Sequence, residues 1–302
     1  MTRPDELGAN ASEIDPTGVW SKSAARLTMS FGAPHRHYRR TDSTNGRARE
    51  LVEAGAPHGT VVTADEQTAG RGRQGRTWTA PAGKALLYSA ILRPLDERHL
   101  LLPLAIPLAV CEAAEELAPE VECKVKWPND IWIEGRKLAG VLIEAKPQDG
   151  WAVIGVGLNL SIAPDEFPPD LRDTAVSILG ALEPSRESSR RCLAKRPRQG
   201  DPGPRSGIRF HRPEGGGGHS ARRLPAGLAA TVLSRHLTHW VEAKPDEVLG
   251  EWRARDALRG REISWDGGSG VADGIEDSGD LVVVAAGGDR VVLGAGEVHL
   301  RF

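Results

Sequence analysis

Cysteine is scarce in this sequence, and the few cysteines present do not suggest a covalent framework. Only three of the 302 residues are cysteines, namely Cys111, Cys123 and Cys192. An odd number without the close spacing of metal ligands argues against both a set of disulfides and a zinc site. We therefore expect the protein to work in a reducing compartment, the cytoplasm.

Net charge and long hydrophobic runs are lacking as well. The formal net charge is −2 at pH 7, so the whole chain has no long-range attraction for nucleic acid or an anionic membrane. The longest apolar stretch, Leu100 to Cys111, is too short to cross a bilayer and contains two prolines. Residues 1–11 are polar and lack the apolar segment of a signal peptide. We expect no membrane association, and we expect any anion binding to be local.

What the sequence does contain is enough hydrophobic residues, 39% of the total, for a substantial core in one or two domains. Short β-rich runs alternate with a few segments of helical periodicity, and Asp42 to Asn45 offer cap residues before a helix. Strands are predicted at 35–40, 59–64, 84–92, 121–127, 131–133, 137–144 and 151–160, and helices at 47–54, 104–117, 228–241 and 245–257.

Two later segments differ in composition from this part. Residues 183–225 hold eleven Lys or Arg against four Asp or Glu, a run of four glycines and few large apolar residues. Such a segment cannot bury enough surface to order itself, which predicts a disordered loop. Residues 260–302 contain short β segments separated by Gly and Asp turns, which predicts a small barrel-like unit.

The most distinctive stretch is residues 70–78, in which three glycines and three arginines alternate before a tryptophan. Glycine lets the backbone approach a ligand closely, and arginine pairs with oxyanions through two parallel hydrogen bonds. The stretch fits a phosphate or carboxylate site, but alone it fits equally well an exposed Arg/Gly loop or an RNA-binding segment. Gly155 and Gly157, inside a predicted strand, indicate a ligand or another backbone passing close by.

Four ordered motifs together give a resemblance to a known family. They are Gly70 to Trp78, Lys126 to Asp130 (Lys-Trp-Pro-Asn-Asp), Lys137 to Glu144 and Gly155 to Leu160. In order and spacing they resemble the biotin–protein ligases. The resemblance covers residues 35–182 well and residues 250–302 more loosely, where Gly296 to Arg301 resembles the end of the family's C-terminal domain.

The resemblance implies an α+β fold, in which a mixed sheet is flanked by helices, as in class II tRNA synthetases and lipoate ligases. It divides the chain into an N-terminal extension at 1–34, a catalytic biotin-adenylating domain at 35–255 and a small SH3-like β-barrel domain at 256–302. The basic segment at 183–225 is an insert in the catalytic domain. Family members that also repress transcription carry a winged helix-turn-helix, and the first 34 residues are too short for one. We therefore expect the enzyme-only type, without a DNA-binding domain.

The implied reaction has two steps and three small-molecule participants, biotin, ATP and Mg²⁺. Biotin and ATP form biotinyl-5′-AMP and pyrophosphate, and a lysine of the biotin carboxyl carrier domain of a biotin-dependent carboxylase then takes the biotinyl group as an amide. The first step joins two anions, so cations must neutralise both partners. We expect Mg²⁺ to be held mainly through the ATP phosphates, with no protein metal site. The oligomeric state stays open, with a homodimer as one alternative.

The resemblance also assigns site residues. Lys137, Arg73 and Asp130 are the expected catalytic residues, and Lys137 is expected to contact the biotin carboxylate and the α-phosphate. For Asp130, a role in orienting or deprotonating the carrier lysine and a structural ion pair with Lys126 or Lys137 both stay open. The expected biotin-binding residues are Ser43, Thr44, Asn45, Gln67, Gly70, Arg71, Gly72, Arg73, Lys137 and Gly157, and the expected ATP-binding residues are Arg71, Arg73, Arg76, Trp78, Asn129, Lys137 and Asn159.

Two other functions compete with this interpretation. A lipoate–protein ligase shares the implied fold and adenylate chemistry, but the Arg/Gly loop followed by Lys126 to Asp130 favours biotin. A nucleic-acid-binding protein would use the loop and the basic insert, but it leaves Lys137 and the glycine-containing strand without a role. The insert itself is a tolerated surface insertion, a sequence artefact, or a docking tail for an acidic carrier or nucleic acid.

Overall fold

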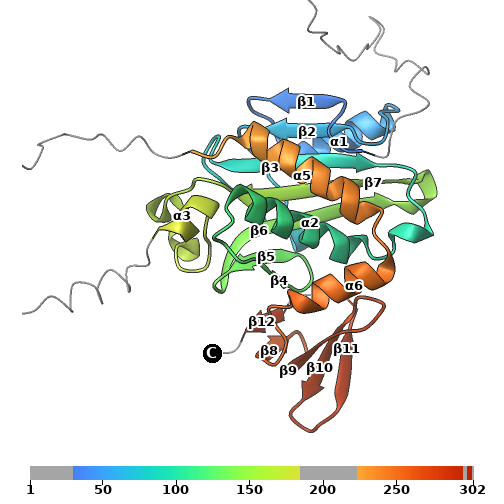
Figure 1. Ribbon diagram of the computed structural model, residues 1–302, viewed down its shortest axis with the longest axis vertical. Helices are drawn as coiled ribbons and strands as arrows, with labels where there is room; N and C mark the ends of the chain where they lie inside the picture. Colours follow the sequence, from blue (N-terminus) through green and yellow to red (C-terminus); the bar gives the residue numbers. More distant parts are fainter. Residues whose placement is uncertain (1–29, 184–222, 295–297, 301–302) are drawn as a thin grey trace, which may run out of the picture.

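A seven-stranded sheet forms the centre of the computed structural model, which describes residues 30–183, 223–294 and 298–300 (Figure 1). The predictions for residues 1–29, for nearly all of the insert at 183–225, for Cys192, and for Gly296, Glu297 and Arg301 lie outside the described residues. No helix in the described ranges combines the length and the apolar character needed to span a membrane.

The sheet is mixed, as predicted. Strands β1 and β2 pair in parallel, and every other neighbouring pair is antiparallel. The strands, in the order β1-β2-β3-β7-β6-β5-β4, are β1 His35–Tyr38, β2 Val61–Ala64, β3 Ala85–Leu92, β7 Trp151–Asn159, β6 Arg136–Lys146, β5 Asp130–Ile133 and β4 Lys124–Lys126.

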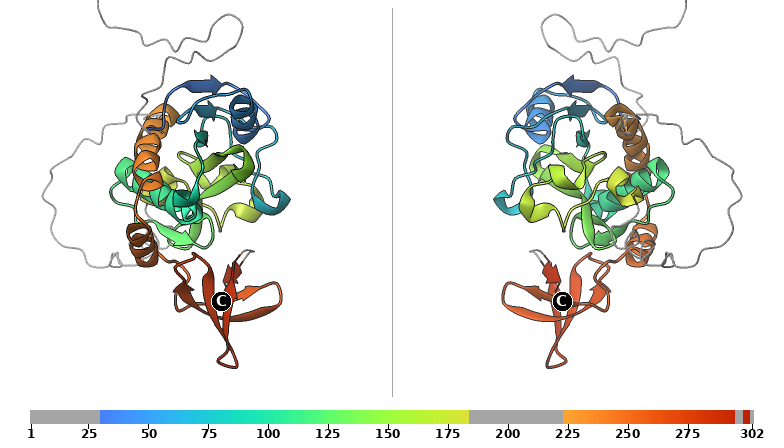
Figure 2. Two further views of the ribbon diagram at one scale, coloured as in Figure 1. Left: turned by 90° about the vertical axis from the view of Figure 1, so that its right-hand side faces the viewer. Right: turned by 90° about the vertical axis from the view of Figure 1, so that its left-hand side faces the viewer.

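Helices cover both faces of this sheet (Figures 1 and 2). Helices α2 (Leu102–Leu117) and α5 (Ala226–Val241) pack on one face, followed by α6 (Pro245–Ala254) at its lower end, and α1 (Thr44–Glu53) packs on the other. Strand β3 is buried along its whole length, because its side chains alternate between the two faces of the sheet and both faces are packed against other apolar residues. Leu86 and Tyr88 face α2 and α5, whereas Ile91 faces α1.

Most element boundaries differ from the sequence predictions by a few residues, and one short helix was not predicted. Helix α1 begins at Thr44, with Ser43 as its N-cap, so Thr44 and Asn45 belong to its first turn and do not precede it. Strand β4 contains only Lys124–Lys126, because its pairing with β5 begins at Lys124 and the predicted residues 121–123 lie outside the ladder. The short helix α3 (Ile178–Leu182) had no clear periodic signal in the sequence.

A second, five-stranded antiparallel sheet lies below the first, next to β4 and α6 (Figure 1). Its order is β11-β10-β9-β8-β12, which confirms the β segments predicted after residue 260. Within the described part of the chain β11 and β12 do not pair with each other, so the predicted barrel is not established. The strands are β8 Glu262–Trp265, β9 Gly268–Ile275, β10 Leu281–Ala285, β11 Arg290–Leu293 and β12 Val298–Leu300.

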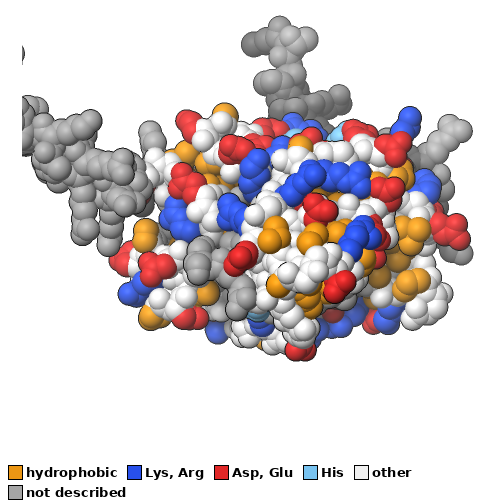
Figure 3. Space-filling view, turned by 90° about the horizontal axis from the view of Figure 1, so that it is seen from below, with side chains coloured by type: hydrophobic (Ala, Val, Ile, Leu, Met, Phe, Trp, Pro, Cys, Tyr) orange, Lys and Arg blue, Asp and Glu red, His pale blue; other side chains and the backbone are white. Residues whose placement is uncertain are grey.

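The surface seen from below carries basic and acidic side chains interspersed with one another (Figure 3). This mixture agrees with the net charge of −2. On this face the molecule presents no broad field of one sign to a nucleic acid.

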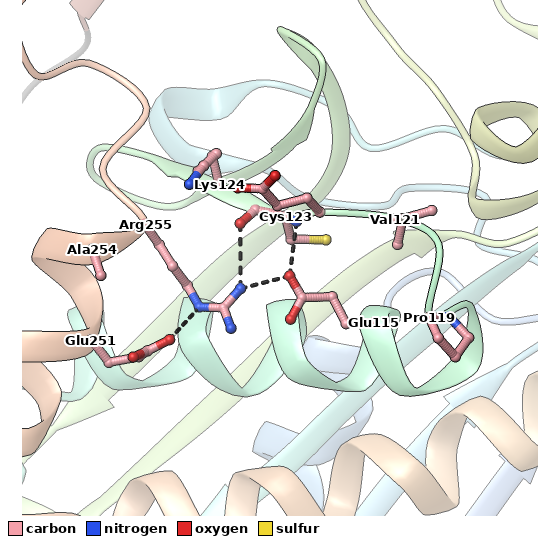
Figure 4. A pocket seen from close by; sticks show the side chains of 9 residues that line it. Glu115, Pro119, Val121, Cys123, Lys124, Glu251, Ala254 and Arg255 are labelled. Carbon is pink, nitrogen blue, oxygen red and sulfur yellow. Dashed lines mark hydrogen bonds and ion pairs between the residues drawn. The ribbon is translucent and has the colours of Figure 1, made fainter.

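The two sheets are joined by the segment that follows α6. The backbone N–H of Val125 in β4 donates to the carbonyl of Arg255 (2.8 Å), and the N–H of Ala257 donates to the carbonyl of Val125 (2.9 Å). The guanidinium of Arg255 bonds Glu115 (2.6 Å) and Glu251 (2.8 Å) and also reaches the carbonyl of Cys123 (Figure 4). These contacts hold the outer edge of β4 against the end of α6.

Asp256, within this joint, makes the stability of the protein depend on pH. Burial raises the pKa of Asp256, and the backbone N–H groups of Leu258 and Arg259 offset this only in part. One carboxylate oxygen is buried without a hydrogen-bond partner among the described residues. Because the folded state favours the protonated form, the free energy of unfolding falls as the pH rises through the ordinary aspartate pKa. The loss is complete above the raised pKa.

We predict that an Asp256→Asn variant, which resembles the protonated form, is more stable than the wild type at neutral pH. The advantage should shrink as the pH falls and disappear below the ordinary aspartate pKa, because both proteins then carry a neutral side chain there. Urea unfolding of both proteins between pH 3 and pH 8 measures the difference. Parallel stability curves over this range would contradict the prediction.

Candidate active site

One cleft of about 490 Å³ collects almost all the site residues predicted from the sequence. It opens on the α1 side of the large sheet, between the N-terminus of α1, the loop at 70–78, strands β5, β6 and β7, and the segment at 167–175. Of the predicted residues only Gly70 is outside the lining. The predicted residues in the lining are Ser43, Thr44, Asn45, Gln67, Arg71, Gly72, Arg73, Arg76, Trp78, Asn129, Asp130, Lys137, Gly157 and Asn159.

The Arg/Gly loop is a narrow hairpin at the edge of the cleft. The N–H of Gly72 donates to the carbonyl of Arg76 (2.7 Å), and the N–H of Trp78 donates to the carbonyl of Gly70 (3.0 Å). A Cβ on Gly70 would lie 2.3 Å from the Trp78 carbonyl oxygen, so this glycine is needed for the approach of two backbones. Gly70 therefore shapes the loop without lining the cleft.

The charge of the cleft is mostly positive. Among the lining residues that the structure describes, five are Lys or Arg and one, Asp130, is a carboxylate. The cations come from the loop at 70–78 and from strands β4 and β6, and they are Arg71, Arg73, Arg76, Lys126 and Lys137. Such a cleft attracts an anion with several oxygens.

The N-terminus of α1 forms a polar corner at one end of the cleft. The backbone N–H and the hydroxyl of Thr44 both donate to the Gln67 side-chain oxygen (2.7 and 3.1 Å). The hydroxyl of Ser89, from β3, lies 2.8 Å from Thr44 Oγ1 and 2.6 Å from Asn45 Oδ1. This corner offers neutral donors and acceptors in fixed positions, next to buried apolar strands.

Asn45 is held in this corner by the strands beneath it. Its Nδ2 donates to the carboxylate of Glu144 (2.8 Å) and faces the carbonyl of Leu142 (3.4 Å). A Cβ on Gly155 would lie 2.2 Å from Asn45 Oδ1, so only glycine leaves room at that position of β7. The sequence predicted a close approach at Gly155, but the neighbour is a side chain and not a backbone.

Lys137 lines the cleft, and both its backbone N–H and its carbonyl make hydrogen bonds to the segment before α3. Its N–H donates to the carbonyl of Thr174 (2.7 Å), and its own carbonyl accepts from Val176 (2.9 Å). Its Nζ pairs with Asp130 Oδ1 at 2.7 Å, and the two side chains are 34% and 19% exposed. The ion pair that was one alternative for Asp130 is thus present, with Lys137 as its partner.

Two asparagines fix the backbone around the cleft. Asn129 accepts from Arg73 Nη1 (3.3 Å) and donates to the carbonyl of Val141 (2.8 Å). Asn159 donates to the carbonyl of Val176 (3.0 Å) and is buried. Arg73 therefore reaches from the loop to the sheet, whereas Asn159 ties β7 to the segment before α3.

Trp78 covers the floor of the cleft. A Cβ on Gly157 would lie 2.3 Å from Trp78 Cε2, and one on Gly140 would lie 3.3 Å from Cζ3. The indole ring is therefore seated on two glycines of neighbouring strands. Its buried N–H has no hydrogen-bond partner among the described residues, and Lys137 Nζ lies 5.8 Å from its ring centre.

Several residues of the site were not predicted from the sequence. Ser89 and Glu144 contact the polar corner without belonging to the cleft lining, and Trp132, Phe167 and His299 line the cleft. Ser89 lies in an apolar strand and Glu144 closes a quoted motif, so their polarity in β-rich runs was the available signal. His299 comes from β12 of the second sheet, and no local pattern indicated that this strand reaches the cleft.

Comparisons with known proteins show what the chain is similar to. A family model described as the biotin/lipoate A/B protein ligase family matches residues 37–160. The biotin–acetyl-CoA-carboxylase ligase of Mycobacterium tuberculosis is 34% identical over 274 residues, which are 86% of this chain and 87% of that protein. The bifunctional ligase/repressor BirA of Bacillus subtilis is 42% identical over 174 residues, 55% of this chain. The match spans about half of the Bacillus protein, 53% of its length.

The fold has a solved counterpart as well. The biotin protein ligase from Aquifex aeolicus in complex with biotin and ATP superposes with a TM-score of 0.62 at 25% sequence identity. The superposition covers 89% of this chain and 99% of that chain. The likeness therefore includes both sheets.

Proposed function

Because the chain belongs to the biotin/lipoate A/B protein ligase family, as one of its biotin ligases, we propose that its cleft attaches biotin to a carrier protein. In the first step the carboxylate of biotin attacks the α-phosphorus of ATP, which forms biotinyl-5′-AMP and releases pyrophosphate. In the second step a lysine of the carrier attacks the biotinyl carbonyl, which forms an amide and releases AMP.

The observation that carries the proposal is the position of Lys137 between a polar corner and a set of loop arginines. Two anions repel each other in the first step, so a site must neutralise both at the reacting atoms. Lys137 lies on β6, and both of its backbone groups bond the segment before α3, while Arg73 bonds Asn129. A preorganised cation costs little reorganisation when charge develops in the transition state.

The polar corner suits the ring of biotin. A ureido ring is neutral, with two N–H donors and one carbonyl, and the corner presents hydroxyl and amide groups next to apolar strands. We assign biotin binding to Ser43, Thr44, Asn45, Gln67, Gly70, Arg71, Gly72, Arg73, Lys137 and Gly157, and ATP binding to Arg71, Arg73, Arg76, Trp78, Asn129, Lys137 and Asn159. In this assignment Gly70 and Gly157 act through the shape that they give to the loop and the floor.

Asp130 has two roles that are compatible with each other. Its ion pair with Lys137 at 2.7 Å places the ammonium group in the cleft. When Lys137 turns to the negative charge of the substrates, the same carboxylate is released, and it can accept a proton from the carrier lysine in the second step.

We expect a magnesium ion to be bound mainly by the phosphates of the nucleotide and not by side chains of the protein. Within the described residues no group of three or more His, Cys, Asp or Glu side chains could hold a metal. We infer that a bound Mg²⁺ would rest mainly on the phosphate oxygens of ATP, because hard oxygen ligands suit it.

The remaining proposals concern the partner, the place of action and the organisation of the chain. We infer that the acceptor is a biotin carboxyl carrier domain and that the reaction takes place in the cytoplasm. We further infer that residues 35–255 form the catalytic domain and residues 256–302 a second domain, whose His299 reaches the cleft.

The test is an assay with purified protein, ATP, biotin and a carrier domain, in which the adenylate is trapped before the carrier is added. We expect biotinyl-5′-AMP to form and the carrier to be biotinylated. Lipoate in place of biotin should give neither product. A protein that forms no adenylate with biotin, or that prefers lipoate, would overturn the proposal.

A further inference from the structure

Glu144 is a carboxylate placed beside a cleft lined mostly by cations, and its role does not follow from the proposed reaction. It lies near the end of β6, and its side chain is 26% exposed. It does not line the cleft. One carboxylate oxygen, Oε2, accepts from Asn45 Nδ2 at 2.8 Å. The other, Oε1, faces Arg49 Nη1 at 3.5 Å and Arg71 Nη1 at 3.9 Å.

These contacts determine which way the Asn45 amide points. A carboxylate and a backbone carbonyl can only accept hydrogen bonds, and the same end of Asn45 faces both Glu144 and the carbonyl of Leu142. That end must therefore be the NH₂ group. At the other end, the hydroxyl of Ser89 lies 2.6 Å from Oδ1 and can donate to it. Three neighbours on two strands, β6 and β3, thus agree on one orientation.

The orientation has a consequence for the ligand. The Oδ1 atom of Asn45 has two acceptor positions, and Ser89 occupies one of them. The other is left for a donor in the cleft, which Asn45 helps to line. Gly155 fixes the place of Oδ1, because nothing larger fits beside it. The cleft therefore presents a fixed acceptor.

We propose that Glu144 is a positioning residue that commits Asn45 to act as an acceptor, and that it thereby selects a ligand ring with an N–H group at that point. The inference rests on the proposed function, since biotin supplies such a ring. A ring with an oxygen in place of the N–H would bring two acceptors together, and a dithiolane ring would leave the Asn45 acceptor unpaired. Either costs binding free energy because a buried polar group lacks its partner.

The charge of Glu144 does not oppose this role. The guanidinium groups of Arg49 and Arg71 face the oxygen that Asn45 does not use. The negative charge is thus balanced on the side away from Asn45. Arg71 also belongs to the Arg/Gly loop, so the residue that orients the ring-binding amide touches the loop that we assign to the phosphates.

The test compares ligand selectivity in two variants. In Glu144→Gln the new amide can accept from Asn45 or donate to it, so only the carbonyl of Leu142 (3.4 Å) and the hydroxyl of Ser89 still favour the original orientation of Asn45. In Arg49→Gln the Asn45–Glu144 hydrogen bond remains, and only a contact of the other oxygen is lost. Each protein is titrated by calorimetry with biotin and with two biotin analogues in which one or the other ureido N–H is replaced by oxygen.

The wild type should prefer biotin over both analogues. In Glu144→Gln we expect the preference to fall at least about tenfold for one analogue, the one whose oxygen faces Asn45, because the amide can now turn its NH₂ group to that oxygen. Arg49→Gln should keep the wild-type preference. An unchanged preference for both analogues in Glu144→Gln would overturn the inference, even if its overall affinity fell. A wild type that does not bind biotin would instead overturn the proposed function.

Discussion

A Lys137→Ala variant is expected to form the adenylate about a thousandfold more slowly than the wild type while keeping its fold. Removal of one group that stabilises developing charge typically costs a factor of about 10² to 10³ in turnover. We expect the upper end of this range for Lys137, because it lines the cleft from β6 and its backbone is held by hydrogen bonds to Thr174 and Val176. Its loss also leaves Asp130 without its partner and thus adds an unpaired negative charge.

The measurement is the release of pyrophosphate from ATP with saturating biotin. Lys124→Ala is the matched control, since Lys124 lies on β4 of the same sheet, pairs with Glu122 and does not line the cleft. We expect this control to keep wild-type turnover. If Lys137→Ala turned over at a near wild-type rate, Lys137 would not be the central cation of the site.

A Gly155→Ala variant is expected to weaken biotin binding about a hundredfold. The added methyl group would displace Asn45, which we propose accepts a hydrogen bond from the biotin ring. The added Cβ would meet Asn45 Oδ1 at 2.2 Å. Strand β7 cannot move aside, because it pairs with β3 on one edge and with β6 on the other. Asn45 must therefore leave its bonds to Glu144 and Ser89, and each lost bond of a buried polar group costs about 1 to 3 kcal/mol.

The same glycine-to-alanine change at another position separates this effect from a general one. In Gly250→Ala, on α6, the new Cβ has no neighbour within 4 Å. We expect unchanged biotin binding and a gain in the free energy of unfolding of about 0.5 to 1 kcal/mol, as for a helical glycine replaced by alanine. Calorimetric titration with biotin and thermal unfolding measure both quantities. Equal biotin affinity in Gly155→Ala and the wild type would show that the ring does not bind beside Asn45.

Most of the large sheet could be predicted from local patterns. The apolar run at 84–92 is typical of a strand buried on both faces, and β3 has both faces in a core. The cap residues before α1 indicated its start, although the boundary fell at Ser43. What local patterns could not provide is the strand order, which places β7 between β3 and β6. That order depends on contacts far apart in the sequence, and only the resemblance to a family implied the type of fold.

The candidate site, like the sheet, could be predicted from local patterns only in part. The Arg/Gly loop, Lys137 and the polar residues at the start of α1 were predicted to act together, and they do line one cleft. The pairing of Lys137 with Asp130 was one predicted alternative, but the partner that holds Asn45 was not predicted, since the Asn45–Glu144 bond joins residues 99 positions apart. Gly155 and Gly157 were correctly interpreted as places of close approach, but their neighbours are the side chains of Asn45 and Trp78. A glycine in a strand indicates that something is close without indicating what.

The segment after α6 limits how this molecule can be divided or recombined. The carbonyl of Arg255 and the N–H of Ala257 are the partners of Val125, so both sides of the proposed boundary at 255 and 256 contribute to the outer edge of β4. A piece of the chain ending at residue 254 would leave that strand as a free edge, which is a template for aggregation. Exchange of the C-terminal sheet between relatives would therefore require transfer of residues 255–257 with a matching β4, and the two sheets should evolve as one inherited unit.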